Sequence, residues 1–167
     1  MLKCRIKSMM DDIQCYQGIS LSKEELEACI LLIKKGGAVD PKYAKKKLPL
    51  AELVAIQRVG QDIVGVGAIK RCRSEYACSI AKKSEFQFDP CSHELGYVAI
   101  KERYQRQGLS KRIMAKLLSE FQGRPLFATT SNKYMKKTLE KAGFVQRGKE
   151  WKGEKEQLSL WIKNGES

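Results

Sequence analysis

Residues 105–112, "QRQGLSKR", place a glycine among basic side chains directly before a helical pattern. Backbone N–H groups at a helix N-terminus have no partner within the helix, and the macrodipole adds about half a positive charge there. Gly108 has no Cβ to hold an anion away from the backbone, while Arg106, Lys111 and Arg112 add charge around it. The pattern predicts a phosphate site.

The elements that flank this junction must position it. Residues 93–101, "HELGYVAIK", indicate a strand, and a short connection leads from them into residues 108–121. That second stretch is predicted to be a helix because its apolar residues recur at helical spacing. They are Ile113, Met114, Leu117, Leu118 and Phe121. The phosphate site is therefore expected where a buried strand passes into an amphipathic helix.

Two further helices are expected. Residues 22–35 begin with a capping box, Ser22 to Glu25, and carry an apolar stripe. Residues 131–144 begin at Ser131 or Asn132 as N-cap and end with Gly143 at the position that favours a left-handed backbone.

Strand patterns fill the gaps between these helices. Residues 51–59 and 62–72 predict a hairpin around Gly60-Gln61, residues 125–130 a single strand, and residues 144–151 and 156–164 a hairpin around Gly153. A strand or a loop opens the chain, and residues 74–92 receive no element. The order predicts an α/β fold, a mixed sheet with helices on its faces, formed as a single domain over residues 1–167.

The chain carries 32 Lys and Arg against 19 Asp and Glu, a net charge of +13. This charge favours an anionic partner or simply a solvated basic surface. The N-terminal stretch holds Lys3, Arg5, Lys7, Asp11 and Asp12 and no apolar core of a signal peptide, and no stretch reaches the length of a membrane span. A cytoplasmic protein with no membrane partner is expected.

Cysteine spacing argues against a metal site. The cysteines form no C-x-x-C pair, and His93 is the one histidine. They are expected to be reduced, mostly buried thiols: Cys4, Cys15, Cys29, Cys72, Cys78 and Cys91. Gly65 and Gly67 lack the third glycine of a dinucleotide fingerprint, so they are expected to be strand positions that a neighbour approaches closely.

The junction resembles the pyrophosphate-binding motif of the GNAT superfamily of N-acetyltransferases, [Q/R]-x-x-G-x-[G/A]. Gln105 and Gly108 match it, while Ser110 replaces the final Gly or Ala. The family's second half, an Asn that opens a helix ending in E-K-x-G-F, is similar to Asn132 and residues 140–144. The resemblance implies a GNAT-like, mostly antiparallel central sheet with helices on both faces. It also implies acetyl-CoA as co-substrate, without a metal.

The resemblance implies a set of site residues. Glu94 stands six residues before Ile100, where histone-type members carry a general base that deprotonates the acceptor amine. Main-chain groups of residues 98–100 would align the pantetheine arm and polarise the thioester carbonyl. The cofactor-binding set is Val98, Ala99, Ile100, Gln105, Arg106, Gln107, Gly108, Leu109, Ser110, Lys111 and Asn132.

Two positions qualify this expectation. His93 beside Glu94 is a relay, an alternative base or a surface neighbour. The family often has a Tyr acid four residues before the Gly of G-F, where this chain has Leu139, and Tyr134 lies too far around the helix to replace it.

Two functions remain open. The first is an acetyl-CoA-dependent N-acetyltransferase acting by direct attack of a primary amine, carried by a small molecule, a protein or an aminoacyl-tRNA. The second is a catalytically weak GNAT fold that binds CoA or nucleic acid. Monomer and homodimer are equally compatible with the sequence.

Overall fold

The computed structural model describes residues 13–37 and 39–165. The chain divides into two compact units: Met1–Lys70 with Tyr97–Glu120, and Arg71–Gly96 with Phe121–Ser167. They are called the first and the second unit below. The charged N-terminal stretch Lys3–Asp12, with Cys4, lies outside the described residues.

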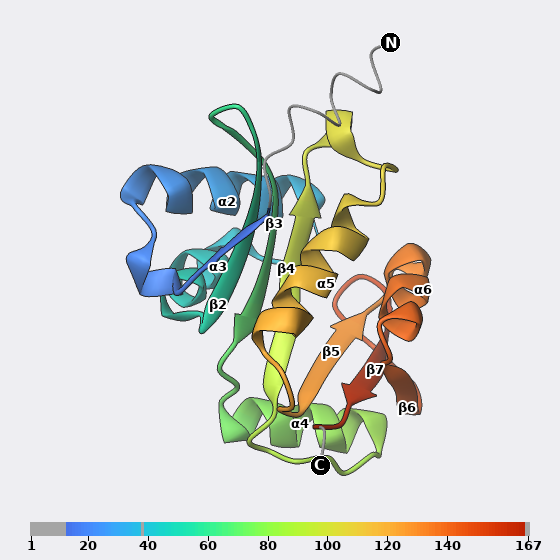
Figure 1. The fold of residues 1–167 in the computed structure, drawn as a ribbon. Coiled ribbons are helices and arrows are strands. Elements are labelled where there is room, and N and C mark those ends of the chain that lie inside the picture. Colours follow the sequence, from blue (N-terminus) through green and yellow to red (C-terminus); the bar gives the residue numbers. More distant parts are fainter. Residues whose placement is uncertain (1–12, 38, 166–167) are drawn as a thin grey trace. The chain divides into compact units, whose positions relative to one another are not determined.

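The strands form one seven-stranded sheet in the order β1-β2-β3-β4-β5-β7-β6 (Figure 1). β4 contributes to both units. Pairing is antiparallel for β1 with β2, β2 with β3, β5 with β7 and β6 with β7, whereas β4 and β5 pair in parallel. The expected α/β fold with a mixed, mostly antiparallel sheet is confirmed. The strands are β1 Gln14–Tyr16, β2 Leu53–Val59, β3 Asp62–Lys70, β4 His93–Ile100, β5 Leu126–Thr130, β6 Val145–Lys152 and β7 Gln157–Lys163.

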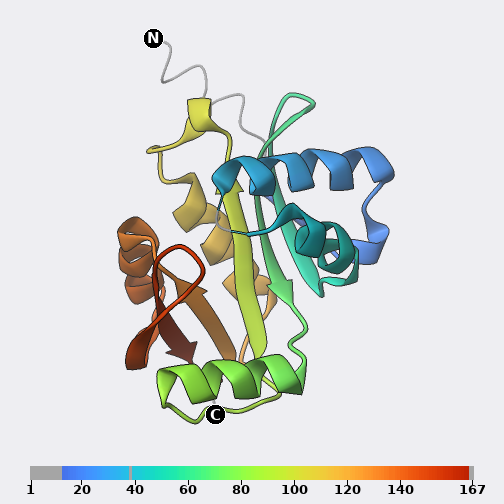
Figure 2. The ribbon, with the colours of Figure 1, turned by 180° about the vertical axis from the view of Figure 1, so that it is seen from behind.

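In the first unit, helices cover both faces of the sheet (Figures 1 and 2). The helices are α2 Lys23–Gly36, α3 Pro41–Lys47 and α5 Leu109–Glu120, with the short 3-10 turns η1 Gly18–Ser20, η2 Leu48–Leu50 and η3 Glu102–Tyr104. α2 packs on one face over a buried cluster that includes Val66 and Ala68 of β3. The alternate residues Gly65 and Gly67 face α5, as the period of two requires.

Close packing explains these two glycines. A Cβ at Gly65 would lie 2.8 Å from Cδ1 of Ile113, and a Cβ at Gly67 would lie 2.7 Å from Cγ2 of the same side chain. The expectation that a neighbour approaches them closely is confirmed.

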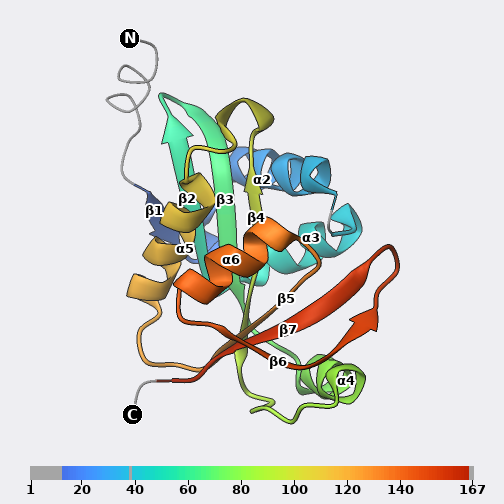
Figure 3. The same ribbon diagram turned by 90° about the vertical axis from the view of Figure 1, so that its right-hand side faces the viewer.

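In the second unit, α4 Ser74–Ser84 and α6 Lys133–Lys141 lie on opposite sides of the β6–β7 hairpin (Figure 3). Ile80 of α4 packs with Phe127, Trp151, Leu160 and Ile162 in one buried cluster. On the other side, Lys136 of α6 pairs with Glu150 of β6 at 3.1 Å. Trp151 and Glu150, which are adjacent on β6, thus contact α4 on one face and α6 on the other.

The expected helix boundaries are confirmed by their caps. Ser22 Oγ accepts the Glu25 N–H at 3.1 Å and the Glu25 carboxylate accepts the Ser22 N–H at 2.9 Å, which is the predicted capping box. Asn132, rather than Ser131, caps α6. Gly143 has φ +94, the left-handed conformation expected just past a helix end.

Two helices had not been predicted. α4 occupies part of the segment that received no element; no side chain caps its start, and Glu85 rather than glycine ends it with φ 54. α3 falls in a stretch for which no element was expected, although Asp40 caps it and Pro41 occupies its first turn. An N-cap Asp followed by Pro is an ordinary helix start.

Candidate active site

The junction between β4 and α5 is held by its own contacts. Tyr104 of η3 is buried beside Val64 and Leu109. The Gln105 amide Nε2 donates to the Ile100 carbonyl at 3.0 Å, which ties the loop to the end of β4. Arg106 has φ 62 and Gly108 has φ 78, so the backbone turns sharply twice before the helix begins. These contacts hold the loop against the end of β4 directly before α5 begins.

The start of α5 offers unpaired donors. The Gly108 carbonyl accepts the Arg112 N–H at 3.1 Å, which makes Gly108 the N-cap. Within the described residues, the N–H groups of Leu109, Ser110 and Lys111 have no acceptor. A Cβ built on Gly108 would meet no protein atom within 4 Å, so the space beside Gly108 is open. Such a helix start can bind a phosphate through its main chain.

Side chains around this start fall into two groups. Arg106, Gln107 and Lys111 are exposed, so their polar ends can reach an anion in solvent. Leu109 is only 2% exposed and packs inward, which leaves its N–H as its only possible contribution. Leu109 could therefore contribute to an anion site only through its main chain, whereas Arg106, Gln107 and Lys111 could also contribute their side chains.

β4 contains a backbone feature that the sequence does not reveal. Tyr97 has φ 54, which is unusual for a bulky residue, and it is buried with the Lys70 ammonium 3.9 Å from its ring centroid. This irregular residue stands directly before the predicted cofactor residues Val98, Ala99 and Ile100. Strained residues of this kind concentrate at functional sites.

Glu94 and His93 point to opposite faces of the second unit. Glu94 is in register with Phe127 of β5 and is half-buried, and register partners share a face. His93 is in register with Leu126, and its ring lies 4.9 Å from the ring of Phe121. A direct relay from Glu94 to His93 is therefore not favoured.

Asn132 has a structural role at the start of α6. Its Oδ1 accepts the Tyr134 N–H at 2.9 Å and the Met135 N–H at 3.1 Å. The amide Nδ2 is not used in this cap and stays available as a donor to a ligand.

Leu139 occupies a closed position. It is 1% exposed, whereas Tyr134 at the start of the same helix is 68% exposed. We expect Leu139→Tyr to lower the free energy of unfolding by about 1–3 kcal/mol, because the larger side chain would overpack its site and bury a hydroxyl. Urea unfolding measures this, with Tyr134→Phe as the neutral control. A variant of unchanged stability and higher turnover would instead show that the site admits an acid.

Metal and thiol chemistry have little support in the described residues. No group of three His, Cys, Asp or Glu side chains within residues 13–37 and 39–165 could hold a metal ion. Five described cysteines are free, but the expectation of mostly buried thiols is wrong, because only Cys29 is fully buried. Burial raises the pKa of the Cys29 thiol to about 12. In that same part of the chain, no helix is both long and apolar enough to cross a membrane.

Comparison with known proteins identifies the fold. It resembles a GNAT acetyltransferase from Streptococcus agalactiae, with 14% identity over 93% of this chain and 96% of that one and a TM-score of 0.71. An acyl-CoA N-acyltransferase from Pseudomonas aeruginosa matches with 14% identity over 91% and 98% and a TM-score of 0.68. Arabidopsis thaliana NAA60, solved with a bisubstrate analogue, matches with 10% identity over 92% and 99% and a TM-score of 0.62.

The sequence itself matches the family model "Acetyltransferase (GNAT) domain" over residues 37–156. No curated protein sequence matches. The fold is that of an acyl-transferring enzyme class, and the family model covers most of the chain. The chain belongs to the GNAT acetyltransferase family.

Proposed function

We propose that this protein is an acetyl-CoA-dependent N-acetyltransferase that acts on a primary amine, as one cytoplasmic domain over residues 1–167. The observation that carries the proposal is the start of α5, where three main-chain N–H groups have no acceptor within the described residues and the space beside Gly108 is open. A diphosphate is the ligand that such a helix start suits best, and acetyl-CoA carries one. Arg106 and Lys111 would add charge at its rim.

Acetyl-CoA supplies the activated acetyl group, and the chain supplies proton transfer and alignment. An amine is largely protonated near neutral pH, since a free lysine side chain has a pKa of about 10.4. In this proposal Glu94 takes the proton so that the nitrogen lone pair attacks the thioester carbonyl, and the C–S bond then breaks. The half-buried position of Glu94 on β4 supports this role. Main-chain groups of Val98, Ala99 and Ile100 would polarise the carbonyl.

No residue is assigned as the acid that protonates the departing thiolate. Leu139 is buried and apolar at the position where the family often has Tyr. A thiol with an ordinary pKa of about 8.5 leaves acceptably without such help. This observation favours the second candidate function, a catalytically weak fold that binds CoA or nucleic acid.

The two candidates are separated by release of the CoA thiol. Acetyl-CoA is incubated with the protein and a panel of small amines, peptides and aminoacyl-tRNA, and free thiol is titrated over time. We expect release that depends on one acceptor class. Tight acetyl-CoA binding without acceptor-dependent release would instead support the weak or inactive fold.

Asn132→Asp separates the two roles of that residue. Aspartate retains the oxygen that caps α6, so the unfolding free energy should stay within about 0.5 kcal/mol of the parent. The variant removes the Nδ2 donor and adds a negative charge, so we expect acetyl-CoA affinity to fall by about tenfold if Nδ2 contacts the coenzyme. Calorimetry and urea unfolding give both values. Unchanged affinity would leave Asn132 as a cap alone.

A further inference from the structure

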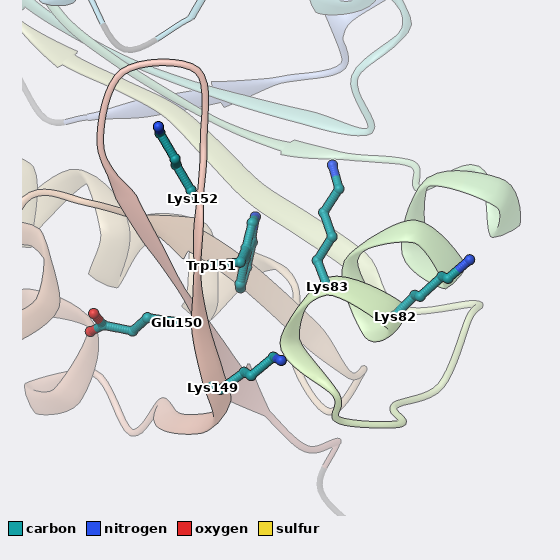
Figure 4. A pocket seen from close by; sticks show the side chains of 6 residues that line it. All are labelled: Lys82, Lys83, Lys149, Glu150, Trp151 and Lys152. Atoms are coloured by element: carbon teal, nitrogen blue, oxygen red, sulfur yellow. The ribbon is translucent and has the colours of Figure 1, made fainter.

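A basic groove lies within the second unit, between the last turn of α4 and β6 (Figure 4). It has a volume of about 670 Å³. We call it the lysine groove; its lining is Lys82, Lys83, Lys149, Glu150, Trp151 and Lys152. None of the candidate site residues described above lines this groove.

Part of its charge is already compensated. Lys149 pairs with Glu85, and Glu150 pairs with Lys136 of α6. By contrast, within the described residues Lys82, Lys83 and Lys152 have no carboxylate within ion-pair distance. Uncompensated like charges at one groove favour an anion there.

Trp151 adds an uncharged donor. The side chain is 8% exposed and packs in the cluster with Ile80 and Phe127, so the ring is fixed. Its indole Nε1 has no acceptor within the described residues, whereas Trp161 Nε1 donates to Ser159 Oγ at 2.9 Å. Since the indole N–H is a donor only, an acceptor from outside the chain would satisfy it.

Figure 4 shows the directions in which the lining side chains point. The Trp151 nitrogen and the ends of the Lys83 and Lys152 side chains point to the same side of the groove. Lys82 and Lys149 point elsewhere, and Glu150 points away from the groove. Two ammonium groups and one indole N–H therefore form the candidate site.

The dipole of α4 explains only part of the positive charge at the lysine groove. Lysines in the last turn of α4 interact favourably with the negative end of the helix dipole, which accounts for Lys82 and Lys83. That reason does not extend to Lys152 and Trp151, which lie on a strand.

We propose that Lys83, Lys152 and Trp151 Nε1 bind a phosphate group of the amine acceptor. The ammonium group of lysine is a compact point charge that binds phosphate, and the indole N–H can donate to a further phosphate oxygen. The proposal rests on the proposed function. It names the acceptor as an amine that carries phosphate, either a small phosphorylated amine or an RNA-linked one.

The location fits an acceptor site of the proposed enzyme. Trp151 shares its buried cluster with Phe127, and Phe127 is the register partner of Glu94. Because register partners face the same side of a sheet, the lysine groove and the proposed base belong to one face of the second unit.

The two tryptophans provide the test. In ¹H–¹⁵N spectra of the full chain, we expect O-phosphoethanolamine, inorganic phosphate or a short single-stranded RNA to move the Trp151 indole resonance. The Trp161 resonance should stay in place. Trp151→Phe assigns the signal, and ethanolamine, which lacks phosphate, should have no effect. RNA that binds at least about tenfold more tightly than the small phosphates would identify the RNA-linked source, because several phosphates then contribute.

A matched pair of variants locates the site. Lys83→Gln with Lys152→Gln should weaken phosphate binding by about tenfold or more, because hydrogen bonds to charged groups are lost. Lys45→Gln with Lys46→Gln removes the same charge from the exposed surface of α3 and should leave binding within about twofold. Equal losses in both pairs would overturn a local site in favour of the general field.

Two further results would overturn the proposal. One is a Trp151 resonance that none of the phosphate probes moves, and the other is a response to an aspartate-rich peptide alone.

Acetyl-CoA binding at the start of α5 is followed in the same spectra through the Leu109, Ser110 and Lys111 amides. A silent Trp151 with acetyl-CoA bound defeats only this inference. A phosphate response without acetyl-CoA binding defeats the proposed function instead.

Discussion

Gly108→Val is expected to weaken acetyl-CoA binding by about 2 kcal/mol or more, which is about 30-fold. Gly108 has φ +78, a conformation that a β-branched residue adopts only with strain. The added Cβ would meet no protein atom within 4 Å, so the side chain would project into the open space beside Gly108, where we propose that the diphosphate lies. A diphosphate would be kept from the Leu109, Ser110 and Lys111 donors. Isothermal titration with acetyl-CoA measures the loss.

Gly60→Val is the matched control. Gly60 also has a positive φ, +60, with nothing within 4 Å, but it lies in the β2–β3 turn. It should carry a similar conformational cost and leave acetyl-CoA affinity unchanged. Ser110→Ala should lose at most one hydrogen bond, about 1 kcal/mol. If Gly108→Val folds and binds acetyl-CoA as the parent does, residues 104–111 form only a turn and not a phosphate site.

Glu94→Gln should lower turnover by about 100-fold or more and leave acetyl-CoA affinity nearly unchanged, because a general base contributes to the chemical step alone. Glutamine retains the size of the side chain and cannot take the proton. Turnover is measured by CoA-thiol release at saturating acceptor.

His93→Gln serves as the comparison, since His93 faces the opposite side of the strand and contacts Phe121. Its turnover should stay within about threefold of the parent. A Glu94→Gln variant as active as the parent between about pH 6 and pH 9 would remove the base assignment.

Most helices and strands could be predicted from short-range sequence patterns. Three features depend only on residues that are close together in the sequence. They are the capping box of α2, the Gly60-Gln61 turn and Gly143 after α6. Sequence patterns read such features well because their hydrogen bonds close over short distances. α4 lacked these signals, since no side chain caps it and Glu85 takes the left-handed end position. Its buried residues Ala77, Ile80 and Ala81 were the one usable pattern.

The candidate site was predictable only in part. Gly108 and its basic neighbours are contiguous, so the sequence could indicate the phosphate site directly. The left-handed backbone of Tyr97 could not be foreseen, because nothing about a tyrosine in a strand pattern indicates a positive φ. The lysine groove depends on α4 meeting β6, a long-range contact between segments about 70 residues apart.

The most direct test of the account follows the start of α5 itself. Acetyl-CoA is titrated into ¹⁵N-labelled protein, and the amide resonances of Leu109, Ser110 and Lys111 are monitored. We predict that acetyl-CoA and 3′,5′-ADP both move these three resonances, whereas acetyl-pantetheine, which lacks the diphosphate, leaves them in place. Three resonances that stay in place at saturating acetyl-CoA would contradict the account.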